Sequence, residues 1–255
     1  MSPFKNLLRS SILVYDSSFG GLTAHPHMAL ASSYYGADPS LGEGFKGQAY
    51  ALPTRDKDNQ LMSLSDLHWH IETFLGYGAS HPNQMFQVLP IACGEGEYKH
   101  EQIAPYFTKA ADNVFLPSYW LHLLKKLEHP KLIVQVSDGA NLTEVIEQLD
   151  QATKAWGKFE VITTCDNDGS DAVQKWARSK KHAWTPFPAD TDRFKEKAKI
   201  ILDNQLTWYG THMIAFCSPR DAVLKQRILH AQKEHLKVKT IWLPENQEPL
   251  TTKML

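Results

Sequence analysis

Cysteine is scarce in this chain of 255 residues, with only three copies. Cys93, Cys165 and Cys217 are odd in number, widely spaced and without a CxxC pair. This spacing excludes a disulfide framework and a zinc ribbon, and it favours reduced thiols. We therefore expect a cytoplasmic protein.

A surplus of positive charge and a long apolar run are also missing. Basic residues number 27 and acidic residues 28, whereas a general nucleic-acid binder normally carries a basic excess that displaces counterions from phosphates. Nothing approaches the roughly 20 apolar residues of a membrane span. Nucleic acid and membrane are therefore not expected partners, and without a GxSxG pattern no Ser–His–Asp triad is predicted.

What the chain does contain is typical of folded domains. Hydrophobic residues make up 42% and charged residues 22% of the sequence. The length suits two domains of roughly 100–150 residues each. The segment Leu127-Glu128-His129-Pro130 follows a helical stretch and ends on proline, which disfavours helix at the residue before it. We therefore predict one domain over residues 1–128 and a second over residues 129–255.

The second half alternates short apolar runs with amphipathic stretches. Strands are predicted at 131–136, 159–164, 183–187, 211–216 and 238–243, and helices at 141–156, 168–180, 191–209 and 220–234. Five strands separated by four helices predict a parallel sheet with helices on both faces. The first half is also α/β, with strands predicted at 11–15, 48–53, 86–91 and 114–116 and helices at 63–76, 103–110 and 119–127.

Glycine-rich loops adjoin the strands of the first half. In open α/β sheets ligands bind beyond the carboxyl ends of the strands, and glycine lets backbone amides approach an anion closely. These loops predict a phosphate or pyrophosphate pocket, although glycines that simply form turns would give the same pattern. The candidate ligand-binding residues are Ser17, Ser18, Gly20, Gly21, Gly42, Gly44, Gly47, Gln48, Gly94, Gly96 and Tyr98.

The equivalent loops of the second half are acidic. Carboxylates at helix N-termini cap the helices themselves and repel phosphate, so these loops predict ordinary helix caps, a cationic or Mg²⁺-bridged ligand, or a site that has lost its ligand. The residues of interest there are Ser137, Asp168, Gly169, Asp171, Asp190, Ser218 and Arg220.

Two histidine pairs, His25/His27 and His68/His70, have spacings that metal sites use. On a strand, residues i and i+2 share a face, so His25 and His27 could chelate a metal ion. On the helix predicted at 63–76, His68 and His70 point about 200° apart, which excludes joint binding. The sequence places no cysteine or carboxylate beside either pair, so no metal site is predicted.

The second half resembles the SLOG superfamily over about residues 130–243. Residues 187–194 (FPADTDRF), followed by Asn204, are similar to the family's "FPADWDRY … RN" stretch, and residues 213–216 (MIAF) are similar to its "LIAF" strand. The resemblance implies a Rossmann-like domain for a nucleotide-derived ligand. The family's three ligand loops correspond to the loops around Ser137, Gly169 and Ser218, where most of its glycines are replaced.

The first half resembles a macrodomain-like family of bacterial and bacteriophage proteins over about residues 11–117. The matching segments are 15–21 (YDSSFGG), 42–56 (GEGFKGQAYALPTRD), 93–98 (CGEGEY) and 103–107 (IAPYF). The departures are Asp16 and Ser18, where the family has Gly and Asn, and His25-Pro26-His27 in place of a glycine-rich turn. Macrodomains bind ADP-ribose, and some hydrolyse ADP-ribosyl bonds. The chain is therefore predicted as a macrodomain-like α/β unit followed by a SLOG-like, doubly wound Rossmann-like unit.

Three functional hypotheses follow. The leading one is binding or sensing of an ADP-ribose- or NAD-derived ligand in the first half, by a phage- or defence-related protein in the cytoplasm of a bacterium or an infected host cell. The second is an ADP-ribosyl glycohydrolase, with Asp56 or Glu95 as the catalytic base. The third is an assembly protein, as a homo-oligomer or with a protein partner, built on ligand-binding folds that have lost their sites.

Overall fold

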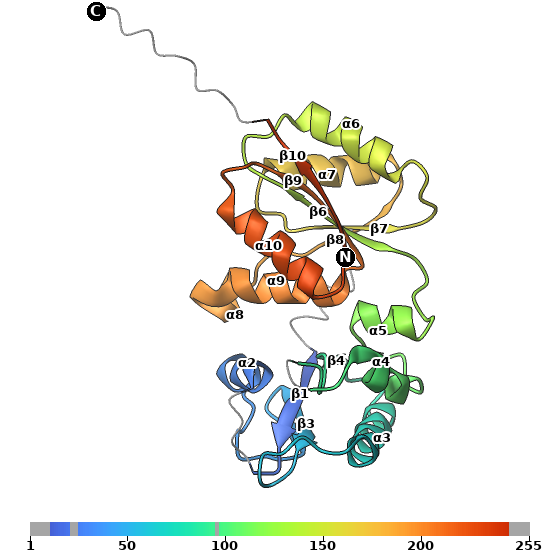
Figure 1. Cartoon of the computed structure of the whole chain (residues 1–255), viewed down its shortest axis with the longest axis vertical. Coiled ribbons are helices and arrows are strands. Elements are labelled where there is room, and N and C mark those ends of the chain that lie inside the picture. Colours follow the sequence, from blue (N-terminus) through green and yellow to red (C-terminus); the bar gives the residue numbers. More distant parts are fainter. Residues whose placement is uncertain (1–10, 21–24, 95–96, 245–255) are drawn as a thin grey trace, which may run out of the picture. The chain divides into compact units, whose positions relative to one another are not determined.

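The computed structural model describes residues 11–20, 25–94 and 97–244, which form two compact α/β units (Figure 1). The first unit contains the chain up to Glu128 together with Thr191–Glu196, and the second contains His129–Asp190 and the chain from Lys197 onwards. Among the described residues, no helix is both long and apolar enough to cross a membrane.

The first unit is built on a five-stranded mixed sheet with the order β2-β3-β1-β4-β5. Strands β1, β3, β4 and β5 are parallel, whereas β2 runs antiparallel to β3 as a hairpin. Its strands are β1 (Ile12–Ser18), β2 (Gly44–Lys46), β3 (Ala49–Arg55), β4 (Phe86–Val88) and β5 (Val114–Phe115), and its helices are α2 (Pro26–Tyr34), α3 (Leu64–Ser80), α4 (His100–Ile103), the 3₁₀ helix η1 (Ala104–Phe107) and α5 (Ser118–Leu123).

Helix α3 supplies much of the apolar core of this unit. Ser63 caps its start, and Leu67, Ile71 and Phe74 recur at helical spacing and are fully buried. The helix was predicted to end at Gly76 but continues to Ser80. The added turn contains Gly78, which lets α3 approach β5 closely, since a Cβ there would lie 3.0 Å from Val114.

Proline shortens other predicted elements of the first unit. Pro90 ends β4 at Val88, before the predicted strand end at residue 91, and half of the helix predicted at 103–110 is the 3₁₀ helix η1, with Pro105 in its first turn. Helix α5 is also shorter than predicted, since it ends at Leu123.

The second unit is a doubly wound, all-parallel sheet, as predicted. Its order β8-β7-β6-β9-β10 is, in chain order, 3-2-1-4-5, which is the Rossmann-like arrangement. Helices α6 and α7 pack together on one face, and α9 and α10 on the other (Figure 1). The strands are β6 (Lys131–Val136), β7 (Glu160–Thr163), β8 (Ala183–Pro186), β9 (His212–Cys217) and β10 (Lys237–Trp242), and the helices are α6 (Leu142–Thr153), α7 (Asp168–Ser179), α9 (Ala198–Tyr209) and α10 (Ala222–Lys233).

The helix predicted at 191–209 is interrupted. It is divided into α8 (Thr191–Phe194), the 3₁₀ helix η2 (Lys195–Lys197) and α9, with Lys195 in the left-handed region at φ 48°. Helix α8 belongs to the first unit, where the Arg193 guanidinium lies 4.0 Å from the centre of the Tyr35 ring and Phe194 packs edge-on against Tyr34. These contacts with Tyr34 and Tyr35 explain the break, and the spacing of apolar residues along the sequence does not reveal them.

Candidate functional site

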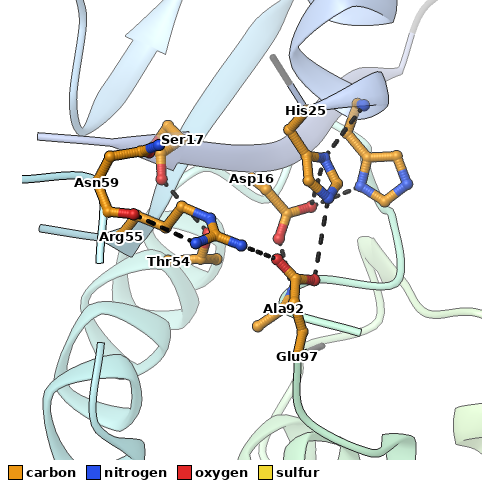
Figure 2. Close-up of polar contacts among 9 residues, drawn as sticks. Asp16, Ser17, His25, Thr54, Arg55, Asn59, Ala92 and Glu97 are labelled. Carbon is orange, nitrogen blue, oxygen red and sulfur yellow. Dashed lines mark hydrogen bonds and ion pairs between the residues drawn. The ribbon is translucent and has the colours of Figure 1, made fainter. Parts of the chain in front are cut away.

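The carboxyl edge of the first sheet has a topological switch point between β1 and β4. The chain leaves β1 towards β3 on one side, whereas the later connection from β3 crosses to β4 on the other side. Open α/β sheets bind ligands in the crevice that opens at such a point. A cluster of polar side chains lies there, in which the buried carboxylates Asp16 and Glu97 contact the partly exposed His25 and Arg55 (Figure 2). His27, which is also partly exposed, contacts Asp16 as well.

Asp16 is the centre of this cluster. Its side chain is 2% exposed, and its Oδ1 accepts a hydrogen bond of 2.6 Å from the Ala92 amide in the loop after β4. Its Oδ2 lies 2.5 Å from His27 Nδ1 and 3.9 Å from His25 Nδ1. Burial alone would raise the pKa of Asp16, but the hydrogen bonds and charge interactions with His27, His25 and Ala92 outweigh it and lower the pKa. Asp16 is therefore a buried carboxylate at neutral pH.

The two histidines are held by the start of helix α2. His25 is the N-cap residue, Pro26 occupies the first turn, and His25 Nδ1 accepts a long hydrogen bond of 3.3 Å from the His27 amide. The two rings contact edge to face with their centres 4.6 Å apart. Burial lowers the pKa of His25, and the attraction of Asp16 opposes this only in part, so its imidazole is neutral at pH 7.

Glu97 closes the cluster from the loop that follows β4. Its side chain is 3% exposed, and Oε1 accepts a hydrogen bond of 2.8 Å from Arg55. The other oxygen, Oε2, is buried without a hydrogen-bond partner among the described residues and lies 3.9 Å from His25 Nε2. Gly94 makes this position available, because a Cβ at residue 94 would lie 2.8 Å from Glu97 Oε2.

The glycines at 42–47, predicted to bind phosphate, are accounted for by the chain's own packing. Gly44 lies in β2, and Gly47 forms the turn into β3 at φ 65°. A Cβ on Gly47 would lie 2.4 Å from the Gly36 carbonyl oxygen, and one on Gly42 would lie 2.8 Å from the Phe19 ring. Of the two interpretations of this segment, the structure favours turn and packing glycines.

The polar candidates of the first half also contact their own chain. Ser17 Oγ donates to the Gly42 carbonyl, and Ser18 Oγ donates to the Asp56 carbonyl while accepting from the Gly20 amide. Gln48 Nε2 donates to the Ser11 carbonyl and Tyr98 donates to the Met62 carbonyl. Three predicted residues, Gly21, Glu95 and Gly96, lie outside the described residues.

Asp56, the other predicted catalytic base, has the contacts of a turn residue. Its Oδ1 accepts hydrogen bonds of 2.9 Å from the amides of Asp58 and Gln60. The carboxylates that face the histidines are instead Asp16 and Glu97, which the sequence analysis did not select. The available signal for Asp16 was an acidic residue directly after the apolar run of residues 12–15 in a buried strand, where an unpaired charge is costly.

The second histidine pair behaves as predicted from its helical spacing. His70 is buried, with Nδ1 at 2.9 Å from Glu43, whereas His68 is exposed near Glu72 and stacks on Tyr106. The two side chains therefore do not share a site.

The acidic loops of the second unit surround pockets at the carboxyl edge of its sheet. One pocket is lined by Asp138, Gly139, Asn141, Ser218 and Arg220 at the switch point between β6 and β9, and another by Ser137, Asp168 and Gly169. Gly169 packs α7 directly onto β6, since a Cβ there would lie 2.5 Å from Val136. Asp171 lies in the first turn of α7, and Asp190 ends the 129–190 segment of the unit.

Helix N-termini at this edge are capped by the chain. The side chains of Asn141, Asn167 and Asp221 accept hydrogen bonds from the amides of Glu144, Ser170 and Leu224 respectively. Ser137 Oγ, in turn, donates to Asp221 and accepts from the Ser218 amide. Of the predicted alternatives, the structure therefore favours ordinary helix caps, because in each of these helices a side chain already accepts from an amide of the first turn.

Thiol chemistry at the site is disfavoured by the environment of Cys93. Burial raises the pKa of this thiol, and Asp16 and Glu97 raise it further, while the pKa of the buried Cys217 is raised by burial as well. We expect one fast-reacting thiol in the native protein, the exposed Cys165, and three in denaturant. Titration with a chromogenic disulfide reagent would show this, and Cys165→Ser should remove the fast phase. A fast phase that persists in this variant would contradict the assignment.

Comparisons with protein-family models, with curated proteins and with solved structures find no match to this chain.

Proposed function

We propose that the protein binds a nucleotide-derived ligand of the ADP-ribose or NAD class at the carboxyl edge of the first sheet. The observation that carries the proposal is the switch point between β1 and β4, where polar side chains converge from four chain segments: β1, the start of α2, the end of β3 and the loop after β4. Convergent polar groups at a switch point are the usual setting of ligand sites in open α/β sheets.

The surroundings of the switch point support a ligand with an aromatic base and a charged part. Phe19 follows directly on β1, contacts the His70 ring edge to face and remains 46% exposed, so part of its ring is open to a base. Arg55 ends β3 and Lys57 follows two residues later, with its carbonyl packed against Gly20. An exposed aromatic ring next to cationic residues suits a base joined to a diphosphate.

The second unit is less suited to such a ligand. Its pockets contain Asp138, Asp166 and Asp221, and the helix N-termini beside them are capped. Negative charge and paired amides both weaken phosphate binding. Because the first-unit site also contains two carboxylates, Asp16 and Glu97, the proposal assigns the ligand to the first unit on the exposed Phe19 ring and on the cations of residues 55 and 57.

Calorimetric titration of the full chain with ADP-ribose and with NAD tests the proposal. We expect saturable binding that Phe19→Ala weakens about tenfold or more, because stacking of a base on an aromatic ring is worth roughly 1–3 kcal/mol. Trp242→Ala is the matched control, since Trp242 is also exposed, at 58%, but ends β10 in the second unit.

Two results would overturn the proposal. One is the absence of binding to ADP-ribose, NAD and cyclic ADP-ribose, together with no such ligand in the purified protein by mass spectrometry. The other is binding that Trp242→Ala weakens and Phe19→Ala leaves unchanged, which would move the ligand to the second unit.

A further inference from the structure

Two imidazoles and a carboxylate present their ligand atoms to one another at the carboxyl edge of the first sheet. One oxygen or nitrogen atom each of Asp16, His25 and His27 lies within 4.8 Å of the others. The three residues come from the end of β1 and the start of α2, so the backbone fixes their approach. From this geometry we propose that Asp16, His25 and His27 bind a divalent transition-metal ion of the zinc class.

The distances are close to those that a metal ion would impose. Ligand atoms held at about 2.0–2.1 Å from a tetrahedral zinc ion are roughly 3.3 Å apart. The separations of Asp16 Oδ2 are 2.5 Å to His27 Nδ1 and 3.9 Å to His25 Nδ1, one below and one above that value. Shifts of less than about 1 Å therefore complete the set. The metal ion replaces the proton between Asp16 and His27, and it takes the place of the long hydrogen bond from the His27 amide to His25 Nδ1.

Glu97 supplies a second, independent observation. Its Oε2 is buried without a hydrogen-bond partner in the described part of the chain, and it faces His25 Nε2 at 3.9 Å (Figure 2). A histidine that binds metal through one ring nitrogen characteristically donates its other N–H to a carboxylate. With the metal on Nδ1 of His25, the Nε2–H group gives Glu97 Oε2 the donor that it lacks. Glu97 is therefore a positioning residue for His25.

The charges of the cluster also favour a cation. Asp16 and Glu97 are both almost fully buried, whereas Arg55 is the cation paired with Glu97, through the other oxygen. Burying two carboxylates is costly unless nearby positive charge offsets them. Two imidazoles in the ligand set favour zinc and its transition-metal neighbours over Mg²⁺ and Ca²⁺, which prefer all-oxygen sites. Three protein ligands also leave a coordination position open to water or a ligand atom.

The test is a titration of the full-length, tag-free protein with Zn²⁺ after removal of bound metal by a chelator. We expect one zinc ion per chain by calorimetry, and a Co²⁺ complex with the visible absorption of a low-coordinate site. His27→Ala should abolish the stoichiometric binding. Glu97→Gln should retain one zinc ion but weaken its binding about 10- to 100-fold. His68→Ala is the control, because His68 is an exposed histidine of the same unit outside the cluster, and its affinity should equal that of the wild type.

Circular dichroism of each variant shows whether it is folded. If His27→Ala does not fold, the zinc affinity of the near-isosteric Glu97→Gln tests the proposal instead. Failure of the wild type to bind one equivalent of zinc would overturn the proposal, and so would equal zinc affinities for wild type, His27→Ala and Glu97→Gln. Because the titration contains no nucleotide, its outcome is independent of the proposed function: zinc binding without ADP-ribose binding removes only the latter, and the reverse result removes only the metal site.

Discussion

Replacing Gly47 by alanine is expected to destabilise the first unit by about 3 kcal/mol or more. Two costs add at this position. The residue sits at φ 65°, which costs a non-glycine residue roughly 1–2 kcal/mol, and the new Cβ would lie 2.4 Å from the Gly36 carbonyl oxygen and 2.8 Å from that of Tyr35. Both obstacles are backbone atoms, so the β2–β3 hairpin must move away from the chain that follows α2. Calorimetric unfolding, with hydrogen exchange of peptides from the hairpin, would measure the loss.

Gly36→Ala is the matched control for this variant. Gly36 has nearly the same backbone angle, at φ 67°, but its Cβ would meet nothing closer than the Gly47 Cα at 3.7 Å. It should therefore cost only the conformational part, about 1–2 kcal/mol. Equal losses for the two variants would show that the close approach of the hairpin contributes nothing.

Arg227→Ala is expected to destabilise the second unit by about 3–5 kcal/mol. The guanidinium is buried, with Nε at 2.6 Å from Asp203 Oδ1, and it also donates to Gln135 Oε1. Burial already raises the pKa of Asp203, although Arg227 opposes this. Removal of the arginine leaves the partly buried Asp203 carboxyl group, whose side chain is 23% exposed, without the cation that stabilises its charged form.

The loss should grow with pH. A carboxyl group whose pKa is raised by folding favours the folded state below its ordinary pKa of about 4, and this contribution is lost as the pH rises through the folded pKa. Without Arg227 that pKa rises further, so Arg227→Ala should cost more at pH 7 than at pH 4. Melting temperatures across this range would show the trend.

Two controls separate the buried ion pair from other effects of the substitution. Arg178→Ala removes an exposed arginine whose guanidinium lies over Trp184, and it should cost no more than about 1 kcal/mol. The double variant Arg227→Met/Asp203→Leu should recover part of the stability, because paired apolar side chains replace paired charges. A loss below about 1 kcal/mol in Arg227→Ala would mean that solvent screens the pair.

The fold of the second unit could be predicted because its signals are local. Runs such as Lys131–Val136 and His212–Cys217 are buried strands, and the helices between them have one apolar face and recognisable caps such as Asn141. The strand order of the first unit was not predictable in the same way. It depends on the crossing from β3 to β4 over β1, and no periodicity in the sequence records which strands pair.

The site illustrates the same limit. The histidines at 25 and 27 were noted as a pair that could chelate a metal ion if they lay on a strand, but no metal site was predicted, and they are the cap and first turn of α2. Their carboxylate partners could not be placed, because Asp16 meets the loop after β4 through a contact that spans 76 positions of the chain. The glycines at 42–47 were predicted to bind phosphate, whereas they form a hairpin that packs closely against Gly36.

The break in the long helix after β8 has a consequence for the order in which the protein is made. Phe194 is 2% exposed and packs with Tyr34, while Arg193 donates to the Tyr34 carbonyl and to Gln48 Oε1, all within the first unit. A chain emerging from the ribosome therefore holds an incomplete first unit until residue 196 has been synthesised, by which stage three of the five strands of the second sheet already exist. The first unit therefore cannot complete its packing around Tyr34 until much of the second unit has been synthesised.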